Sequence, residues 1–344
     1  MKTAVIGLGA IGALVAGYLK SKGVPVVAVG RPEQKKAIEK DGLIIEGARG
    51  RFLVYLDVKL RLEEKVDLAI IAVKTQDIRD AIDRSREFLS GPAILSTQNG
   101  VRADKLLELM LGPENIVSSI VMFGGTYTPF NKVVHNFEGN WLIGRPQGAN
   151  DAKVKEVVEF LKIAFNTIEV ENISAMKWTK VFVNFSNTLP ALVGKSMQET
   201  YGNLEMCKLS LRLLKEGFGV VDKLGISLSN MPDFDIEKLK GLTRMPLDEA
   251  APIYSGIMRN LSKEPLYGSI LQSIRRGRAS EIDFINGEIA NQARLNNIEA
   301  KLNTRVTELV HHVEATKKFL TFAEVSEDME KNARSAQLTR EDFF

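Results

Sequence analysis

The chain has 344 residues, of which 44% are hydrophobic and 26% charged, so it suits two globular domains rather than one simple core. Its 46 basic residues nearly balance its 43 acidic ones, which argues against a nucleic-acid partner. Cys207 is the single cysteine, so no intrachain disulfide forms, and a cytoplasmic location is expected. The sequence patterns also lead us to expect no signal peptide, no membrane span and no metal site.

Strand and helix patterns alternate over the first third of the chain. Residues 3–9 have the pattern of a short buried strand, and residues 10–23 that of a helix that ends at Gly23. Further strands are predicted over 24–30, 66–74 and 92–100, and further helices over 32–42, 76–91 and 102–112. The segments 43–47 and 51–60 fit either a hairpin or crossover strands. The βαβαβ order predicts a doubly wound parallel sheet.

The rest of the chain changes from strands to helices. Residues 115–146 contain short strands and turns, which we expect to complete the sheet with antiparallel members. From about Asp151 the strand patterns fade, and helical patterns cover 154–165, 174–194 and 205–225. The second half is therefore predicted to be mostly helical.

A glycine-rich stretch joins the first predicted strand to the first predicted helix. Gly7, Gly9 and Gly12 form the pattern G-x-G-x-x-G. In such a loop the first glycine allows a tight turn, the second lets the backbone approach a pyrophosphate, and the third lets the helix pack close to the strand. The helix N-terminus then offers free N–H groups to phosphates. The stretch predicts a dinucleotide site; the alternative is a close helix–strand contact without a ligand.

The position of this loop favours a particular fold. We predict an α/β fold, with an N-terminal Rossmann-type doubly wound sheet followed by a mostly α-helical C-terminal domain. The predicted bounds are 1–170 for the dinucleotide-binding domain, 171–325 for the helical domain and 326–344 for a charged C-terminal tail. We expect the tail to extend over the surface or over a partner subunit.

The end of the second strand indicates which dinucleotide binds. An NAD enzyme usually has Asp or Glu there to hold the ribose 2′-hydroxyl, whereas this chain has Gly30 and Arg31. The planar fork of an arginine suits a 2′-phosphate, so NADP is favoured. Glu33 lies nearby and keeps NAD as the alternative.

Polar residues follow the next two predicted core strands. Lys74 ends the run 66–74, and Asn99 is the last residue but one of the run 92–100. Open α/β sheets bind ligands at the carboxyl ends of their strands, so both residues are candidate cofactor or substrate contacts. The alternatives are a solvated lysine and a plain turn at Asn99-Gly100.

At this point the chain resembles the ketopantoate reductases, the 2-dehydropantoate 2-reductase family. The shared elements follow the family order along nearly the whole chain: GLGAIG at 7–12, Arg31, VKTQ at 73–76, QNGV at 98–101, WTKVFVN at 178–184 and the segment 269–289. The last two place charged and amide groups in the helical domain, which makes them more specific than the glycine loop.

The segment 178–188 has the pattern of a helix with one polar face. Lys180, Asn184 and Thr188 stand at i, i+4 and i+8, among apolar residues such as Phe185. Such surroundings lower the pKa of a lysine, as a proton donor near neutral pH needs, although a lysine that only extends to solvent fits the pattern equally. The resemblance implies that Lys180, rather than Lys177, is the proton donor.

The resemblance also implies roles for further residues. The implied cofactor contacts are Gly7, Leu8, Gly9, Ala10, Ile11, Gly12, Arg31, Lys74, Asn99 and Glu281. The implied substrate contacts are Asn99, Asn184, Thr188 and Ser269. Ser280 could equally cap a helix whose first turn holds Glu281 and Asp283.

These features predict an NADPH-dependent reduction of ketopantoate to pantoate, as in pantothenate biosynthesis, by a protein that forms a homodimer. Thr188 stands where the family usually has asparagine, and Gln198 appears at a later asparagine position. These departures support an alternative, a related NADP-dependent reductase of another small 2-oxo acid. A second alternative is an NADP-binding regulator without turnover.

Overall fold

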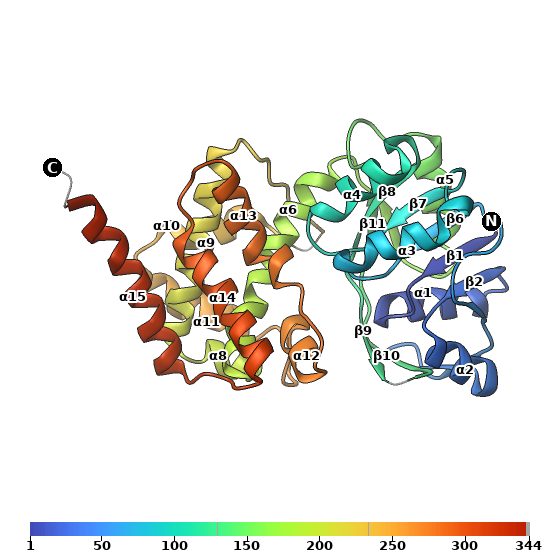
Figure 1. The fold of residues 1–344 in the computed structure, drawn as a ribbon. Helices are drawn as coiled ribbons and strands as arrows, with labels where there is room; N and C mark the ends of the chain where they lie inside the picture. Colours follow the sequence, from blue (N-terminus) through green and yellow to red (C-terminus); the bar gives the residue numbers. More distant parts are fainter. Residues whose placement is uncertain (129, 233, 342–344) are drawn as a thin grey trace. The chain divides into compact units, whose positions relative to one another are not determined.

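The computed structural model describes residues 1–128, 130–232 and 234–341, with the backbone alone over 333–341. It divides into two compact units, Met1–Ser174 and Ala175–Phe344. The predicted boundary after residue 170 lies close to this division, where α6 (Ile173–Asn184) begins. Figure 1 shows an α/β unit coloured blue to green and a helical unit coloured green to red.

An eight-stranded sheet forms the centre of the N-terminal unit. Its order is β12-β11-β8-β7-β6-β1-β2-β5, and all its neighbouring pairs are parallel except β11 with β8. The strands are β1 (Thr3–Ile6), β2 (Val26–Val29), β5 (Asp57–Lys59), β6 (Leu68–Ile71), β7 (Ala93–Ser96), β8 (Ile116–Val121), β11 (Trp141–Gly144) and β12 (Thr167–Glu169). The predicted doubly wound sheet is confirmed.

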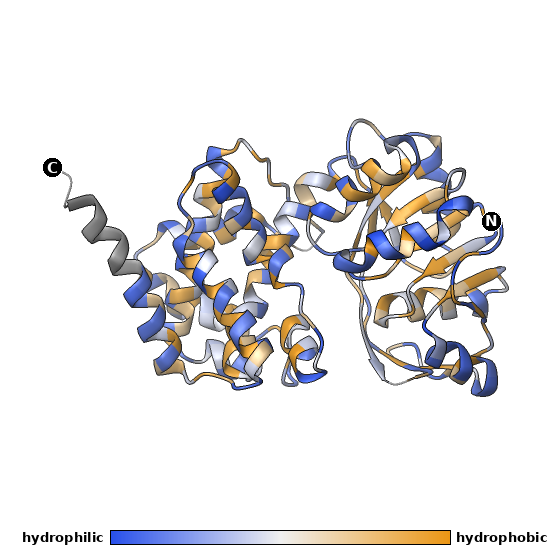
Figure 2. Cartoon of the chain, in the orientation of Figure 1, coloured by the Kyte–Doolittle hydropathy of each residue, from blue (hydrophilic) through white to orange (hydrophobic). Residues whose placement is uncertain are grey.

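Helices cover both faces of this sheet, which therefore separates two apolar cores. The helices are α1 (Ala10–Ser21), α2 (Pro32–Asp41), α3 (Ile78–Ser85), α4 (Arg102–Leu111) and α5 (Ala152–Leu161). Val5 packs in one core with Leu14 of α1, whereas Ala4 and Ile6 pack in the other with Ile78 of α3. The strands are apolar on both faces, as buried parallel strands are, and Figure 2 shows them mainly in the hydrophobic colour.

A second, four-stranded sheet has the order β4-β3-β10-β9. Its strands are β3 (Leu43–Gly47), β4 (Phe52–Val54), β9 (Gly124–Thr128) and β10 (Lys132–Phe137). The prediction that 115–146 completes the main sheet is thus wrong for β9 and β10. Two glycines let this sheet pack against α1: a Cβ on Gly17 would lie 2.3 Å from Ile45, and one on Gly125 would lie 2.7 Å from Leu14.

The C-terminal unit is helical, as predicted. Its helices are α6 with α7 (Thr188–Val193), α8 (Met197–Tyr201), α9 (Leu204–Lys223), α10 (Ile236–Arg244), α11 (Leu247–Arg259), α12 (Ser269–Arg275), α13 (Asn286–Leu295), α14 (Lys301–Thr316) and α15 (Phe322–Glu341). The long α9 contacts α10, α11, α13 and α14, so it forms the centre of the unit. Asn203 caps its first turn by accepting hydrogen bonds from two backbone N–H groups.

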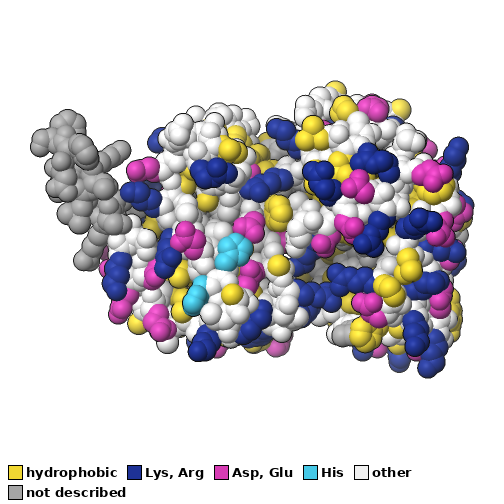
Figure 3. Space-filling view, in the orientation of Figure 1, with side chains coloured by type: hydrophobic (Ala, Val, Ile, Leu, Met, Phe, Trp, Pro, Cys, Tyr) yellow, Lys and Arg dark blue, Asp and Glu magenta, His cyan; other side chains and the backbone are white. Residues whose placement is uncertain are grey.

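The predicted tail 326–344 continues the helix α15 as far as Glu341, and residues 342–344 lie outside the described residues. Within the described ranges, none of the helices combines the length and the apolar character that a membrane crossing requires. The same ranges hold no group of three His, Cys, Asp or Glu side chains placed to bind a metal ion. Basic and acidic side chains are interspersed on the face shown in Figure 3.

Candidate functional site

Two glycines of the loop after β1 are required by close packing. Gly7 has φ +105°, which favours glycine, and a Cβ atom on it would lie 2.7 Å from the backbone nitrogen of Val73. A Cβ atom on Gly12 would lie 1.9 Å from the carbonyl oxygen of Gly7. The helix α1 therefore approaches the loop only because Gly12 has no side chain.

The middle glycine of the loop has open space beside it. The nearest atom to a Cβ on Gly9 would be the carbonyl oxygen of Ala72, 4.0 Å away. Gly9 is the N-cap of α1, and among the described residues no side chain caps this helix or places an acid in its first turn. The N–H groups at Ala10 and Ile11 can therefore donate to a phosphate, which the helix dipole attracts. This geometry fits the pyrophosphate of a dinucleotide.

The carboxyl ends of four neighbouring parallel strands carry the other predicted residues of this unit. In sheet order these strands are β7, β6, β1 and β2. Asn99 follows β7, Lys74 follows β6 and Arg31 follows β2, so all three lie along the edge that holds the glycine loop. Strand order reverses between β1 and β6, which is where open α/β sheets bind ligands.

Two buried glutamines, which the sequence analysis gave no role, form hydrogen bonds between the loops at this edge. Gln34 donates to the carbonyl oxygen of Leu8 at 2.7 Å and accepts from the backbone N–H of Arg31 at 3.0 Å. Gln98 donates to the carbonyl oxygens of Ile71 and Val73, both at 2.8 Å. Gln34 thus connects the glycine loop to Arg31, and Gln98 connects the ends of β6 and β7. Gln98 is the first residue of the QNGV motif and Gln34 lies three positions after Arg31, but the hydrogen-bond partners of both depend on tertiary packing.

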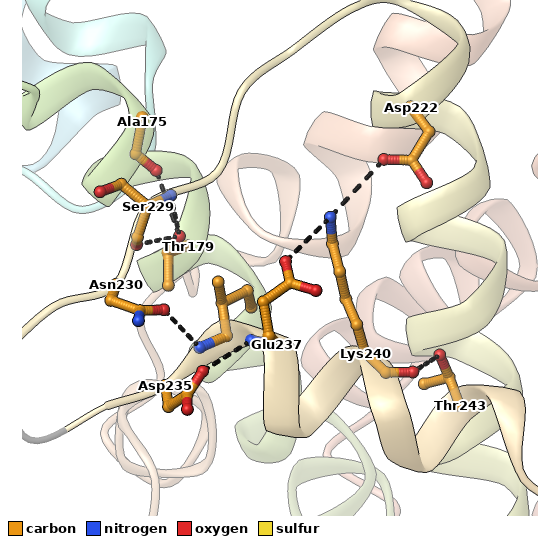
Figure 4. A network of polar contacts seen from close by, with 10 residues as sticks. Ala175, Thr179, Asp222, Ser229, Asn230, Asp235, Glu237, Lys240 and Thr243 are labelled. Carbon is orange, nitrogen blue, oxygen red and sulfur yellow. Dashed lines mark hydrogen bonds and ion pairs between the residues drawn. The ribbon is translucent and has the colours of Figure 1, made fainter.

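In the C-terminal unit, α6 carries Lys180 and, one turn later, Asn184. The helix is fixed beside Lys180 by the buried Thr179, whose hydroxyl donates to the carbonyl oxygen of Ser229 at 2.8 Å and accepts from the Ser229 N–H at 3.2 Å. Figure 4 shows this link between α6 and the segment that leads into α10. Thr179 therefore links α6, next to Lys180, to the segment before α10.

Lys180 has the lowered pKa that a proton donor needs. Burial is the main cause, and the like charge of Lys177 on the preceding turn adds to it, while the carboxylate of Glu281 acts in the opposite direction. Together they lower the pKa of Lys180 from 10.5 to about 8. The structure thus brings Lys180 and Glu281 close enough to interact, although they lie far apart in the sequence.

The segment that carries Glu281 is held at both ends by α14. The N–H of Ser280 donates to Glu314 at 2.6 Å, and the imidazole of His311 lies 3.0 Å from both Asp283 and Glu314. Ser280 also accepts from the N–H of Ile282 at 3.2 Å, at the start of the short 3-10 helix Ile282–Phe284. Glu281 is the N-cap of this helix and so precedes the first turn in which it was expected. Burial alone would lower the pKa of His311, but its two carboxylate partners raise it above its usual value.

We predict that His311 makes the stability of this unit depend on pH. The pKa of His311 is higher in the folded state than in the unfolded state, where it is about 6.5. Its protonated form therefore stabilises the fold fully below about pH 6.5, and this contribution is lost as the pH rises through the pKa of the folded state. The melting temperature of wild type should therefore exceed that of His311→Gln most at pH 6, and the difference should shrink toward pH 9. His312→Gln, at the exposed neighbouring position, is the control. Parallel curves for wild type and His311→Gln would contradict the prediction.

Thr188, a predicted substrate contact, belongs to a hydrogen-bonded chain inside the C-terminal unit. The residue is fully buried, and its hydroxyl donates to the amide oxygen of Asn286 at 2.6 Å. Asn286 in turn donates to Asn303 at 2.9 Å, which bonds to Glu216. The hydroxyl of Thr188 therefore has its hydrogen bond within the unit, and a contact of Thr188 with a substrate stays a prediction.

The other substrate-side positions differ in their surroundings. Ser269 is exposed at the first position of α12, and Asn184 is half-buried at the end of α6. Gln198 donates to the carbonyl oxygens of Ser262 and Glu264 and accepts from the N–H of Leu266. Gln198 thus holds the loop that leads to α12.

Comparisons with known proteins cover almost the whole chain. The family model described as ketopantoate reductase PanE/ApbA matches residues 3–148, and the model of its C-terminal part matches residues 172–314. The chain is 32% identical to a 2-dehydropantoate 2-reductase of Pyrococcus horikoshii, over 90% of this chain and 96% of that protein. It is 29% identical to the enzyme of the same name from Pyrococcus abyssi, over 92% and 98%.

Solved structures show the same fold. A PanE/ApbA family ketopantoate reductase from Ralstonia eutropha JMP134 matches with a TM-score of 0.76 and 22% identity, over 92% of this chain and 99% of that one. A ternary structure of D-mandelate dehydrogenase with NADH and anilino(oxo)acetate matches with a TM-score of 0.80, the same identity and the same coverage. The same fold thus occurs in a ketopantoate reductase and in a D-mandelate dehydrogenase.

Proposed function

The chain belongs to the ketopantoate reductase family and is an oxidoreductase, and from this premise we propose that it reduces ketopantoate to pantoate with NADPH. The observation that carries the proposal is Lys180, a lysine with a pKa near 8 on the same helix as Asn184. Such a lysine is still largely protonated at neutral pH, yet it releases its proton more readily than an ordinary lysine.

The cofactor would be held by the N-terminal unit. The glycine loop and the first turn of α1 would bind the pyrophosphate, and Arg31, Lys74 and Asn99 would make further contacts from the same sheet edge. Glu281 stays the further cofactor contact that the resemblance implies. When bound, a reduced nicotinamide supplies the hydride that converts the keto carbon into an alcohol carbon.

Lys180 would carry out the proton transfer. As hydride reaches the keto carbon, the carbonyl electron pair moves onto oxygen, and the ammonium of Lys180 would stabilise this negative charge. The Nζ–H bond of Lys180 then breaks and the proton passes to the oxygen, which gives the hydroxyl group and leaves a neutral amine. The amine recovers its proton from solvent. Asn184 and Ser269 would orient the substrate, with Asn99 contacting both substrate and cofactor.

The direct experiment is an absorbance assay of NADPH oxidation with ketopantoate and a panel of other 2-oxo acids, each repeated with NADH. Ketopantoate should have the highest kcat/KM. If only another 2-oxo acid is turned over, the proposed substrate is wrong and the proposed mechanism still holds. A related 2-oxo acid reductase is the second candidate function, because the fold is also that of a D-mandelate dehydrogenase. Cofactor binding without any turnover would favour the non-catalytic regulator.

We predict that Arg31 determines the preference for NADPH. Arg31 is exposed at the end of β2, with its backbone fixed by Gln34, so its guanidinium can reach a 2′-phosphate. Arg31→Ala should raise the KM for NADPH by about 10- to 100-fold, because the variant loses hydrogen bonds to a charged group, and such bonds change the affinity by about this factor. The KM for NADH is the internal control and should change less than about threefold. If the KM rises equally for NADPH and NADH, Arg31 does not bind the 2′-phosphate.

The homodimer and the cytoplasmic location stay predictions from the sequence. Gel filtration with light scattering would test the first, since a dimer should elute with twice the mass of one chain.

A further inference from the structure

Gln34 is a buried amide in the first turn of α2 that makes hydrogen bonds to two separate loops. It is 9% exposed, and its Nε2 donates to the carbonyl oxygen of Leu8, in the glycine loop, at 2.7 Å. Its Oε1 accepts from the backbone N–H of Arg31, which follows β2, at 3.0 Å. A side-chain amide has both donor and acceptor groups, so this one residue holds both loops at once.

The bond to Leu8 fixes the orientation of the peptide group between Leu8 and Gly9. A trans peptide group is planar, and its C=O and N–H bonds point in opposite directions. Because Gln34 holds the carbonyl oxygen of Leu8, the N–H of Gly9 is directed away from Gln34. Gly9 is the N-cap of α1, where backbone N–H groups can donate to a phosphate. Gln34 therefore aligns the loop that would bind the pyrophosphate.

The bond to Arg31 fixes the second loop, which packs closely against the first. The N–H of Arg31 belongs to the peptide group after Gly30, and the N–H of Gly30 donates to the carbonyl oxygen of Lys59 at 2.9 Å. A Cβ atom on Gly30 would lie 2.9 Å from the Leu8 side chain and 3.3 Å from the Oε1 of Gln34. The backbone of Arg31 is thus held although its side chain is exposed. A guanidinium on a fixed backbone loses less freedom when it binds a phosphate.

We propose that Gln34 is a positioning residue for the cofactor, which sets the preference for NADPH over NADH by holding Arg31 in place for the 2′-phosphate. This inference rests on the proposed function, in which Arg31 binds that phosphate. Gln34 acts through Leu8 and Arg31 rather than by touching the cofactor. Its bond to Leu8 serves NADPH and NADH alike, because both carry the pyrophosphate, whereas its bond to Arg31 serves NADPH alone.

The test measures cofactor binding rather than turnover. Gln34→Met replaces the amide by an apolar side chain of nearly the same length, so both hydrogen bonds are lost while α2 should keep its packing. The Kd for NADPH, measured by calorimetric titration, should rise by about 10-fold or more, and the Kd for NADH by about threefold. The preference for NADPH, which is the ratio of the two Kd values, should therefore fall.

Asn115→Ala is the matched control in the same unit. Asn115 is also a buried amide, and it accepts from Lys153 at 2.7 Å. It directly precedes β8, so it lies at the opposite edge of the parallel strands from the glycine loop. Asn115→Ala should lower the melting temperature but change each Kd by less than about twofold, because distant sites act independently.

A double-variant cycle shows whether Gln34 acts through Arg31. In an Arg31→Ala background the guanidinium is absent, so Gln34→Met should raise the Kd for NADPH and the Kd for NADH by the same factor. With Arg31 present, the rise should be larger for NADPH. A residue that only stabilised the fold would raise both Kd values equally in either background.

The outcomes separate this inference from the proposed reaction. If the wild type turns over no 2-oxo acid, the proposed reaction is wrong, and a fall of the preference in Gln34→Met still supports the inference. If the wild type binds both cofactors equally, the inference is wrong together with the role of Arg31. If Gln34→Met keeps the wild-type ratio of the two Kd values, the role of Gln34 alone is wrong. Circular dichroism identifies a variant that fails to fold; if Gln34→Met does, Gln34→Asn, whose amide is one methylene too short to reach both partners, supplies the test with the same expected fall.

Discussion

Lys180→Ala is expected to lower kcat for reduction of the 2-oxo acid by about 10²- to 10⁴-fold, the usual contribution of a general acid. Alanine removes both the proton and the positive charge that would stabilise the alkoxide, so the loss falls on the transition state. The affinity for NADPH should stay within about threefold of wild type, because the predicted pyrophosphate contacts lie in the N-terminal unit. Steady-state kinetics and calorimetric binding of NADPH measure the two effects separately.

The pH dependence gives a second readout for Lys180. Only the protonated lysine can donate, so kcat for reduction should be constant below the pKa of about 8 and should fall as the pH rises through it. Lys177→Ala is the matched variant one turn away. Because it removes a like charge, it should move this fall to higher pH while it retains most of kcat. A Lys180→Ala enzyme with unimpaired kcat would exclude Lys180 as the donor.

Gly12→Ala is expected to lower the free energy of unfolding by about 2–3 kcal/mol, although alanine is the better helix former by about 1 kcal/mol. The new Cβ atom would lie 1.9 Å from the Gly7 carbonyl oxygen, a backbone atom that cannot rotate away, so α1 must shift from the sheet. The shift also displaces the N–H groups that would bind the phosphates, so NADPH affinity should fall as well. Thermal unfolding and calorimetric binding measure the two losses.

Gly9→Ala provides the control within the same loop. Its Cβ atom would meet no protein atom closer than 4.0 Å, so stability should change by less than about 1 kcal/mol. It would nevertheless occupy the space beside the first turn of α1, and NADPH affinity should fall at least about 10-fold. If Gly9→Ala binds NADPH as tightly as wild type, the pyrophosphate does not lie against this loop.

Local patterns were sufficient to predict the fold class and to indicate which residues are candidates for the site. The apolar run over 66–74 and the alternation of strands with helices indicated the parallel sheet, because a strand buried on both faces must be apolar along its whole length. The glycine spacing at 7–12 and the i, i+4 spacing of Lys180 and Asn184 are likewise properties of short segments, so they could be recognised without knowing the tertiary structure.

Partners far apart in the chain could not be predicted in this way. The sequence over 124–137 looked like strands, but the pairing of β10 with β3 depends on which strand edge the surrounding fold leaves open. Thr188 was expected on the polar face of its helix, and only the packing of α13 shows that its hydroxyl donates to Asn286 in the core. The pKa of Lys180 likewise depends on burial and on Glu281, about a hundred residues away. Periodicity indicates which side of an element is buried, whereas hydrogen-bond partners and local charge are set by the elements packed against it.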